Sequence, residues 1–183
     1  MKNQILAFID LETTGLLPNK HEIIEIGCVL ARQEFSESGV LTLEYIDEFE
    51  YKVKPTHIET ADPVGLSING YDEKDWIFAI GLKEAIEATA ARVKNTIMVG
   101  HNVAFDFAFL EKAFEETGIQ NPMHYHKLDT ISIAYAKLHN HKEVEKFSLR
   151  ALCDYLGIEN KRAHSALSDA RATYEIFQKL VNM

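Results

Sequence analysis

The sequence contains little cysteine and no long hydrophobic run, and each shortage excludes a class of protein. Cys28 and Cys153 are the only cysteines among 183 residues, and neither lies in a spacing typical of metal ligands. A disulfide-rich secreted scaffold is therefore excluded, and reduced thiols in the cytoplasm are expected. The longest apolar runs, residues 5–9 and 26–31, are too short to cross a membrane, so no membrane partner is expected.

Basic residues are also scarce relative to acidic ones. The chain has 19 Lys and Arg against 28 Asp and Glu, which gives a formal net charge of −9. This balance argues against a broad basic surface for polyanions. It does not exclude a phosphate-bearing substrate, because divalent ions and backbone N–H groups can hold phosphate without lysines.

The remaining composition is that of a globular protein. Hydrophobic residues make up 46% of the chain, and 183 residues suit one domain with a sizeable core. No repeat, low-complexity segment or linker divides the chain, so we expect a single domain over residues 1–183. Asp10 and Glu12 interrupt the first apolar run, so no signal peptide is expected and the predicted location is cytoplasmic.

The first apolar run ends in two acids. Residues 5–9 predict a strand buried on both faces, and Asp10 and Glu12 follow it on one face because side chains two apart in a strand point the same way. Two neighbouring carboxylates repel each other and are costly to desolvate, and a divalent cation removes both problems. The alternative is that the strand simply ends here and that both acids are solvated.

The rest of the chain predicts an α/β fold with a mixed sheet. Residues 22–31 and 41–53 read as two further strands of an antiparallel meander, the second bent near Asp47. Strand and helix signals then alternate, which favours parallel strands with helical connections. The expected segments are a short helix between Asp62 and Gly70, a helix at 82–93, a strand at 97–100, a helix at 103–117 capped by Asn102, a strand at 126–130 with a helix to 138, a helix from Ser148 to 156, and a last helix at 165–181.

Asp106 is the only polar residue among the eight from 103 to 110. Its helical neighbours at i+3 and i+4 are Phe109 and Leu110, so it shares a face with apolar residues. An ionised carboxylate in that position needs a partner or a metal ion. The alternative is that Asp106 only favours the positive end of its helix.

Asp169 follows the same pattern in the last helix. Thr173, Ile176 and Leu180 continue the same helical stripe, which turns Asp169 toward the core. The alternative is an ion pair with Arg162 or Arg171. His164 lies five residues earlier and does not share this face, so we place it in the loop before the helix, where it could move a proton or simply be exposed.

Three motifs in order resemble those of a known family. They are Asp10-x-Glu12-Thr13-Thr14-Gly15, then His101-Asn102-x-x-Phe105-Asp106, then His164 with four residues before Asp169-Ala170. The set is similar to the exonuclease motifs of the DEDDh 3′–5′ exonucleases of the ribonuclease-H-like superfamily. That branch includes the proofreading subunit of bacterial DNA polymerase III, ribonuclease T and oligoribonuclease. The four-residue gap is typical of its histidine subfamily.

The resemblance implies a fold and a chemistry. The fold would be a ribonuclease-H-like mixed five-stranded sheet, with an antiparallel meander and parallel strands, flanked by helices. Asp10, Glu12, Asp106 and Asp169 would bind two Mg²⁺ or Mn²⁺ ions, which prefer oxygen ligands. His164 would act as general base on the attacking water, and the product would be a nucleoside 5′-monophosphate.

The resemblance also implies which residues meet the substrate. The backbone of the Thr-Thr-Gly turn would contact the terminal nucleotide, and two apolar side chains would pack against the last bases. The family often has His where this chain has Asn69, and Phe105 could equally be a plain core residue. The implied substrate-binding residues are Thr13, Thr14, Gly15, Leu16, Asn69, Asn102 and Phe105.

Several functions stay open on sequence alone. The main prediction is removal of nucleotides from the 3′ end of single-stranded DNA, because the segment from Asp62 to Gly70 is similar to one in the proofreading subunit. The alternatives are the same chemistry on RNA or short oligoribonucleotides, and an inactive nucleic-acid-binding scaffold. An endonuclease or integrase fits the spacing of His164 and Asp169 less well. A polymerase or another protein partner is possible.

Overall fold

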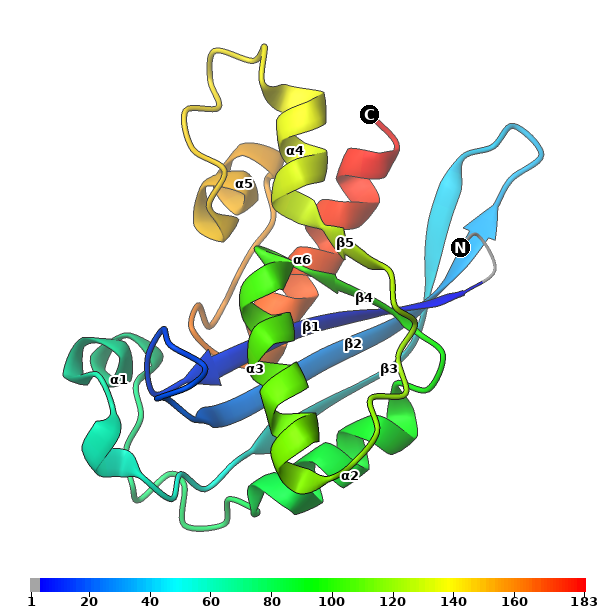
Figure 1. Ribbon diagram of the computed structural model, residues 1–183. Coiled ribbons are helices and arrows are strands. Elements are labelled where there is room, and N and C mark those ends of the chain that lie inside the picture. Colours follow the sequence, from blue (N-terminus) through cyan, green and yellow to red (C-terminus); the bar gives the residue numbers. More distant parts are fainter. Residues whose placement is uncertain (1–3) are drawn as a thin grey trace.

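A computed structural model describes residues 4–183, which build one five-stranded sheet with helices on both faces (Figure 1). The strand order across the sheet is β3-β2-β1-β4-β5, so the first strand lies at its centre. The strands are β1 (Ile5–Thr13), β2 (Ile23–Phe35), β3 (Leu41–Lys52), β4 (Ile97–Gly100) and β5 (Lys127–Asp129). In the part of the chain described, no helix combines the length and apolar character needed to span a membrane.

The sheet is mixed, as the sequence predicts. β1 pairs antiparallel with β2, and β2 pairs antiparallel with β3, which is the expected meander. β4 joins the other edge of β1 in parallel, and β5 continues in parallel beyond it. Because β1 is covered on both faces and both edges, its apolar residues from Leu6 to Ile9 are almost fully buried.

The bend expected near Asp47 is present as a bulge in β3. Leu30 pairs with Asp47, whereas the next residue, Ala31, pairs with Tyr45, so Ile46 has no partner in the register. An extra residue of this kind kinks a strand and increases its twist. β2 also extends to Phe35, beyond the predicted end at residue 31, because it forms a long hairpin with β3.

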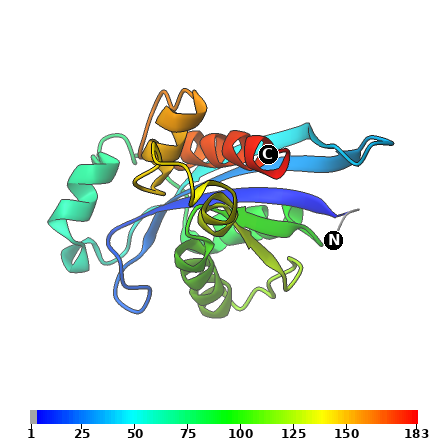
Figure 2. The same cartoon turned by 90° about the horizontal axis from the view of Figure 1, so that it is seen from above.

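The helices cover the two faces of the sheet, and Figure 2 shows α6 and α3 on opposite sides of the strands. One core lies between β1 to β3 and the pair α2 and α3, around Ile9, Ile86 and Phe109. A second lies beneath α6, around Phe8 and Phe177, and a third lies among α4, α5 and α6, around Leu138 and Leu152. The helices are α1 (Pro63–Asn69), α2 (Leu82–Arg92), α3 (Val103–Thr117), α4 (Thr130–Leu138), α5 (Leu149–Leu156) and α6 (Ala166–Val181), with a short 3₁₀ turn at Ile58–Thr60.

Most helix ends follow their sequence signals. Asp62 accepts a hydrogen bond from Val64 N at 2.9 Å at the start of α1, and Ser148 accepts one from Ala151 N at the start of α5. Gly70, Gly118 and Gly157 end three helices with φ between 64° and 69°, a conformation that glycine adopts without strain.

One predicted cap is wrong. Asn102 occupies the residue before α3, but it adopts a left-handed conformation and its side chain makes no capping bond. Asp129 at the end of β5 does this instead: its Oδ2 accepts from Val103 N at 3.0 Å and its Oδ1 accepts from Ile131 N at 2.7 Å. One carboxylate thus caps both α3 and α4. The bond to Val103 joins residues 26 apart in the chain, so the sequence around α3 does not predict it.

Candidate active site

Two acids project from the carboxyl end of the central strand. Asp10 and Glu12 lie near the end of β1, two residues apart and both half-buried. They follow residues 6–8, which β2 and β4 hold on both edges, and β2 continues to pair with Asp10 and Glu12 themselves. This rigidity sets the position of the two carboxylates.

The third acid comes from α3. Asp106 lies in the first turn of that helix and is only 3% exposed. Its Oδ1 accepts a hydrogen bond from Leu11 N at 3.0 Å, at the residue between the two acids of β1. Asp106, which the sequence singles out as an acid among apolar residues, therefore joins α3 directly to the central strand.

The fourth acid comes from α6. Asp169 lies in the first turn of that helix and is 7% exposed. Its two carboxylate oxygens accept from Asn160 Nδ2 and from His164 N, the latter at 3.2 Å. The alternative ion pair with Arg171 is not formed, because Arg171 pairs with Glu48 on β3.

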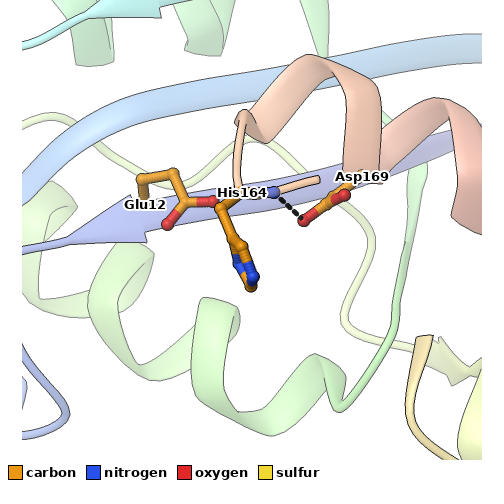
Figure 3. Close-up of side chains that lie close together, drawn as sticks. All are labelled: Glu12, His164 and Asp169. Atoms are coloured by element: carbon orange, nitrogen blue, oxygen red, sulfur yellow. Dashed lines mark hydrogen bonds between the residues drawn. The ribbon is translucent and has the colours of Figure 1, made fainter. Parts of the chain in front are cut away.

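His164 completes the cluster. It lies in the loop before α6, as predicted, and is exposed, with φ of 67°. One ligand atom each of Glu12, His164 and Asp169 lie within 4.8 Å of one another (Figure 3). The backbone N–H of His164 donates a hydrogen bond to Asp169. The carboxylate that lies near Glu12 therefore also holds the backbone of His164.

Burial and mutual repulsion raise the pKa values of these acids. Desolvation is the largest cause for each, and it raises the pKa of Glu12 to about 8 and that of Asp106 to about 8. The pKa of Asp10 is raised well above its ordinary value by burial and then by the charges of Asp106, Asp169, Glu12 and Glu25. The structure thus brings together all four acids that the sequence singled out.

This donor set fits a hard divalent cation. The site offers carboxylate oxygens from three elements, and within residues 4–183 no Lys or Arg forms an ion pair with any of the four acids. Such carboxylates are costly to hold together without a counter-charge, and oxygen-rich sites are those that Mg²⁺ and Mn²⁺ prefer.

The turn after β1 forms one wall of the site. Thr14 is fully buried, its N–H donates to Glu22 O at 2.8 Å, and its hydroxyl accepts from Glu22 N. The Thr14 amide is therefore already bonded within the protein, as is the Thr13 hydroxyl, which donates to Gly15 O. Leu16 is 73% exposed and projects from this turn.

Gly15 is a close approach point in that turn. A Cβ built there would lie 2.5 Å from the ring of His21, so any other residue would displace the imidazole. The same ring accepts a hydrogen bond from Leu17 N at its Nδ1 atom. His21 and Gly15 together fix the path of the turn that carries Leu16.

The other predicted substrate residues have mixed surroundings. Asn69 at the end of α1 donates from Nδ2 to Thr13 O at 2.9 Å and accepts from Tyr71 N, so it joins α1 to the end of β1. Phe105 is half-buried with its ring 5.0 Å from that of Phe109, on the edge of the core. Asn102 is exposed.

A cavity of about 350 Å³ borders the cluster on the α5 side. His164 and Asp169 line it together with Arg150, Cys153 and Asn160. Sequence reasoning missed Asn160, which has no local signal. It also missed Glu25 on β2, which carries the same signal as Asp106, a single acid within an apolar stretch.

Comparison with known proteins places this arrangement among nucleases. The sequence model of the family described as "Exonuclease" (RNase_T) matches residues 7–177. Ribonuclease T of Shewanella frigidimarina is 31% identical over 186 residues, covering 95% of this chain and 80% of that protein. DNA polymerase III PolC-type of Thermotoga petrophila is 28% identical over the whole chain, which corresponds to 12% of the polymerase.

Solved structures show the same fold. Exonuclease I of E. coli, in a complex with a dT13 oligonucleotide, superposes with a TM-score of 0.76 at 18% identity over 97% of this chain. A zinc-bound form of the E. coli exonuclease I complex with single-stranded DNA gives a TM-score of 0.77. This chain spans only about two fifths of those proteins.

Proposed function

Because the chain belongs to the RNase_T exonuclease family and is a 3′–5′ exonuclease, we propose that it removes nucleoside 5′-monophosphates from the 3′ ends of single-stranded DNA. The observation that carries this proposal is the convergence of Asp10, Glu12, Asp106 and Asp169 beside His164. These residues come from β1, α3 and the start of α6, in the order and spacing of the family motifs.

The four carboxylates would hold two Mg²⁺ or Mn²⁺ ions. Divalent cations bound by such a set supply Lewis-acid activation of the phosphate and of water. The chain's own contribution is to fix the four acids on three packed elements, with Asp106 bonded to the backbone of β1. In this way the acids are positioned before the substrate arrives.

His164 would accept the proton of the attacking water. Its side chain is exposed, so it can pass that proton on to solvent. Its backbone is held by Asp169, and one of its ring nitrogens lies within 4.8 Å of a carboxylate oxygen of Glu12 and of Asp169 (Figure 3). The imidazole would thus be held beside the proposed metal ligands, where the attacking water would be bound.

The terminal nucleotide would lie against the turn after β1. Leu16 on that turn, with Val64 and Ile68 on the neighbouring helix α1, offers exposed apolar side chains. α1 is joined to the turn by the bonds from Asn69 Nδ2 to Thr13 O and from Asp62 N to Thr14 O. Nucleobases stack or pack on apolar side chains with little regard to sequence, which suits an exonuclease.

DNA is the favoured substrate, and RNA is the second candidate. Several of the solved structures of similar fold are complexes with DNA oligonucleotides, and the PolC relative is a DNA polymerase. The name of the Shewanella relative, ribonuclease T, favours RNA at a higher sequence identity. The choice is made by experiment.

The test uses one 5′-labelled oligonucleotide in a DNA and an RNA version, incubated with the protein and Mg²⁺ or Mn²⁺. A ladder that shortens from the 3′ end is expected, faster on DNA, and EDTA should abolish it. Asp10→Ala should do the same, whereas Glu87→Gln removes an exposed acid on α2 and should leave the rate unchanged. Faster cleavage of the RNA version would assign the substrate to RNA, and no ladder from folded protein would overturn the proposal.

The domain organisation, the protein partner and the location of the protein are also proposed. Residues 1–183 would act as one exonuclease domain, since the described strands share one sheet with a core on each face. A polymerase or other protein partner stays a prediction, which affinity purification from the source cell would test. A cytoplasmic location stays a prediction too.

A further inference from the structure

Glu25 is a buried carboxylate to which the proposed chemistry gives no task. It lies on β2, directly opposite Glu12 of β1 in the antiparallel register, and is 4% exposed. The surrounding residues of β2 are apolar. Acidic side chains are almost never buried to this degree without a specific partner.

The partner of Glu25 is the beginning of α6. Its Oε1 accepts from Ala166 N at 3.0 Å and from Ser165 Oγ at 3.3 Å. Glu50 on β3 accepts from the same hydroxyl at 3.3 Å. The first N–H groups of a helix lack internal acceptors, and Ser165 supplies no capping bond of its own. Glu25 therefore caps α6 from another strand.

Gly27 keeps the same helix start close to β2. It lies two residues after Glu25, on the same face of the strand. A Cβ built at Gly27 would lie 2.2 Å from the backbone of Ala166 and Leu167, so only glycine lets α6 approach this closely. The first turn of α6 is thus fixed on β2 by one hydrogen-bonded cap and one steric contact.

This first turn and the loop just before it carry two of the five residues of the cluster, Asp169 and His164. His164 precedes Ser165 in the chain, and Asp169 N donates to Ser165 O at 3.0 Å. The side chain of Asp169 in turn accepts from His164 N. Any shift of the segment from Ser165 to Ala166 therefore moves both groups relative to Asp10 and Glu12 on β1.

We propose that Glu25 is a positioning residue, which places His164 and Asp169 against the acids of β1 by holding the start of α6. This inference rests on the proposed exonuclease function. For this role, the side chain of Glu25 must be long enough for its carboxyl oxygen to accept the hydrogen bond from Ala166 N. The role does not require the side chain to be negatively charged.

Two substitutions separate reach from charge. Glu25→Gln keeps the length and an acceptor oxygen but removes the charge, whereas Glu25→Asp keeps the charge but shortens the side chain by one methylene. At saturating metal, we expect Glu25→Gln to stay within about 5-fold of the wild-type kcat. Glu25→Asp should lose about 10²-fold in kcat with KM little changed, because small misplacements of reacting groups have effects of this size.

The matched control lies at the other end of the same helix. Asn182 follows α6, and its side chain bonds both backbone groups of Leu41 on β3, at 3.2 Å and 2.7 Å. We expect both Asn182→Ala and Glu25→Asp to lower the unfolding midpoint, because each weakens a contact that holds α6, but Asn182→Ala should leave kcat unchanged. The unfolding midpoint of every variant is measured beside its kinetics.

The outcomes are distinct. A larger loss in Glu25→Gln than in Glu25→Asp would overturn the proposal in favour of a role for the charge. Unchanged kcat in both, with a lowered unfolding midpoint, would reduce Glu25 to a structural residue. An inactive wild-type protein would instead contradict the proposed function. A wild-type enzyme with the predicted order of variants supports both.

Discussion

Asp10 lies where the charges of the site are most crowded. Burial and four neighbouring carboxylates raise its pKa, so the metal-free protein loses stability by keeping this acid in place. We expect Asp10→Asn to raise the unfolding midpoint by about 2–4 °C at pH 8 in EDTA, an effect of roughly 1 kcal/mol in a chain of this size. The same substitution should reduce exonuclease activity by about 10³-fold.

The measurements are a thermal unfolding scan in EDTA and the rate on the labelled oligonucleotide. Glu87→Gln, which makes the same change in charge on the exposed surface of α2, should alter neither quantity. Turnover by Asp10→Asn near that of the wild-type enzyme would contradict the placement of Asp10 among the metal ligands.

His164 differs from the four acids because it is exposed and lies in a loop. We expect His164→Ala to lower kcat by about 10²–10⁴-fold, the usual contribution of a general base. The affinity for Mn²⁺, measured by calorimetry, should stay near that of the wild-type protein. His139→Ala at the end of α4 is the control for removing an exposed imidazole. A large loss of Mn²⁺ affinity in His164→Ala would make this residue a ligand rather than a base.

The helices show how one side chain can hold two elements. Asp129 caps α3 through Val103 N and α4 through Ile131 N, and α3 carries Asp106 in its first turn. We expect Asp129→Ala to reduce the free energy of unfolding by about 2 kcal/mol, roughly twice the effect of losing one cap. Ser148→Ala removes the single cap of α5 and gives the comparison. Chemical denaturation measures both, and equal losses would mean that only one of the two Asp129 bonds matters.

Elements with signals inside their own sequence were predicted well. The sequence gives both ends of α3, from Val103 to the glycine at 118, and it gives α1 and α5 through their caps and glycines. The end of β2 was predicted too early, because its last residues are held by the hairpin with β3 rather than by a buried face. The cap of α3 was assigned to Asn102, since Asp129 comes from a strand far along the chain.

In the candidate site too, residues with a signal in the local sequence were predicted, and contacts made by the tertiary fold were not. An acid among apolar residues marked Asp106 and Asp169, and both are buried beside β1 and His164. The availability of backbone amides could not be read from the motif: the Thr14 N–H is already bonded to Glu22 O. Contacts of this kind depend on how the turn folds back on β2, which no local pattern records.

For the molecule as a whole, the raised pKa values predict an unusual dependence of stability on pH. The pKa values of Glu12 and Asp106 are raised to about 8, from ordinary values of 4.5 and 3.8, so the folded protein binds protons more tightly than the unfolded chain. The stabilisation is complete below about pH 4 and is lost as the pH rises to about 8. In EDTA, the free energy of unfolding should therefore fall between pH 5 and pH 8.

Urea unfolding at pH 5, 6.5 and 8, with EDTA or with Mg²⁺, measures this effect. Mg²⁺ should flatten the decline, because a bound cation keeps the carboxylates ionised throughout. Acids whose pKa is lowered in the folded protein, such as Glu48 beside Arg171, act at lower pH and do not mask the effect. Stability that rises from pH 5 to pH 8 in EDTA would contradict the electrostatic account of the site.

The order of the site along the chain has a consequence for biosynthesis. Asp10 emerges early from the ribosome, Asp106 midway, and Asp169 only with the last helix, while β1 is covered on one face by that same helix. A nascent chain or a truncated translation product therefore lacks the complete cluster, whatever part of the sheet it has formed. The proposed site can therefore be complete only after translation has passed the first turn of α6, so cleavage through this site cannot begin on a partly synthesised chain.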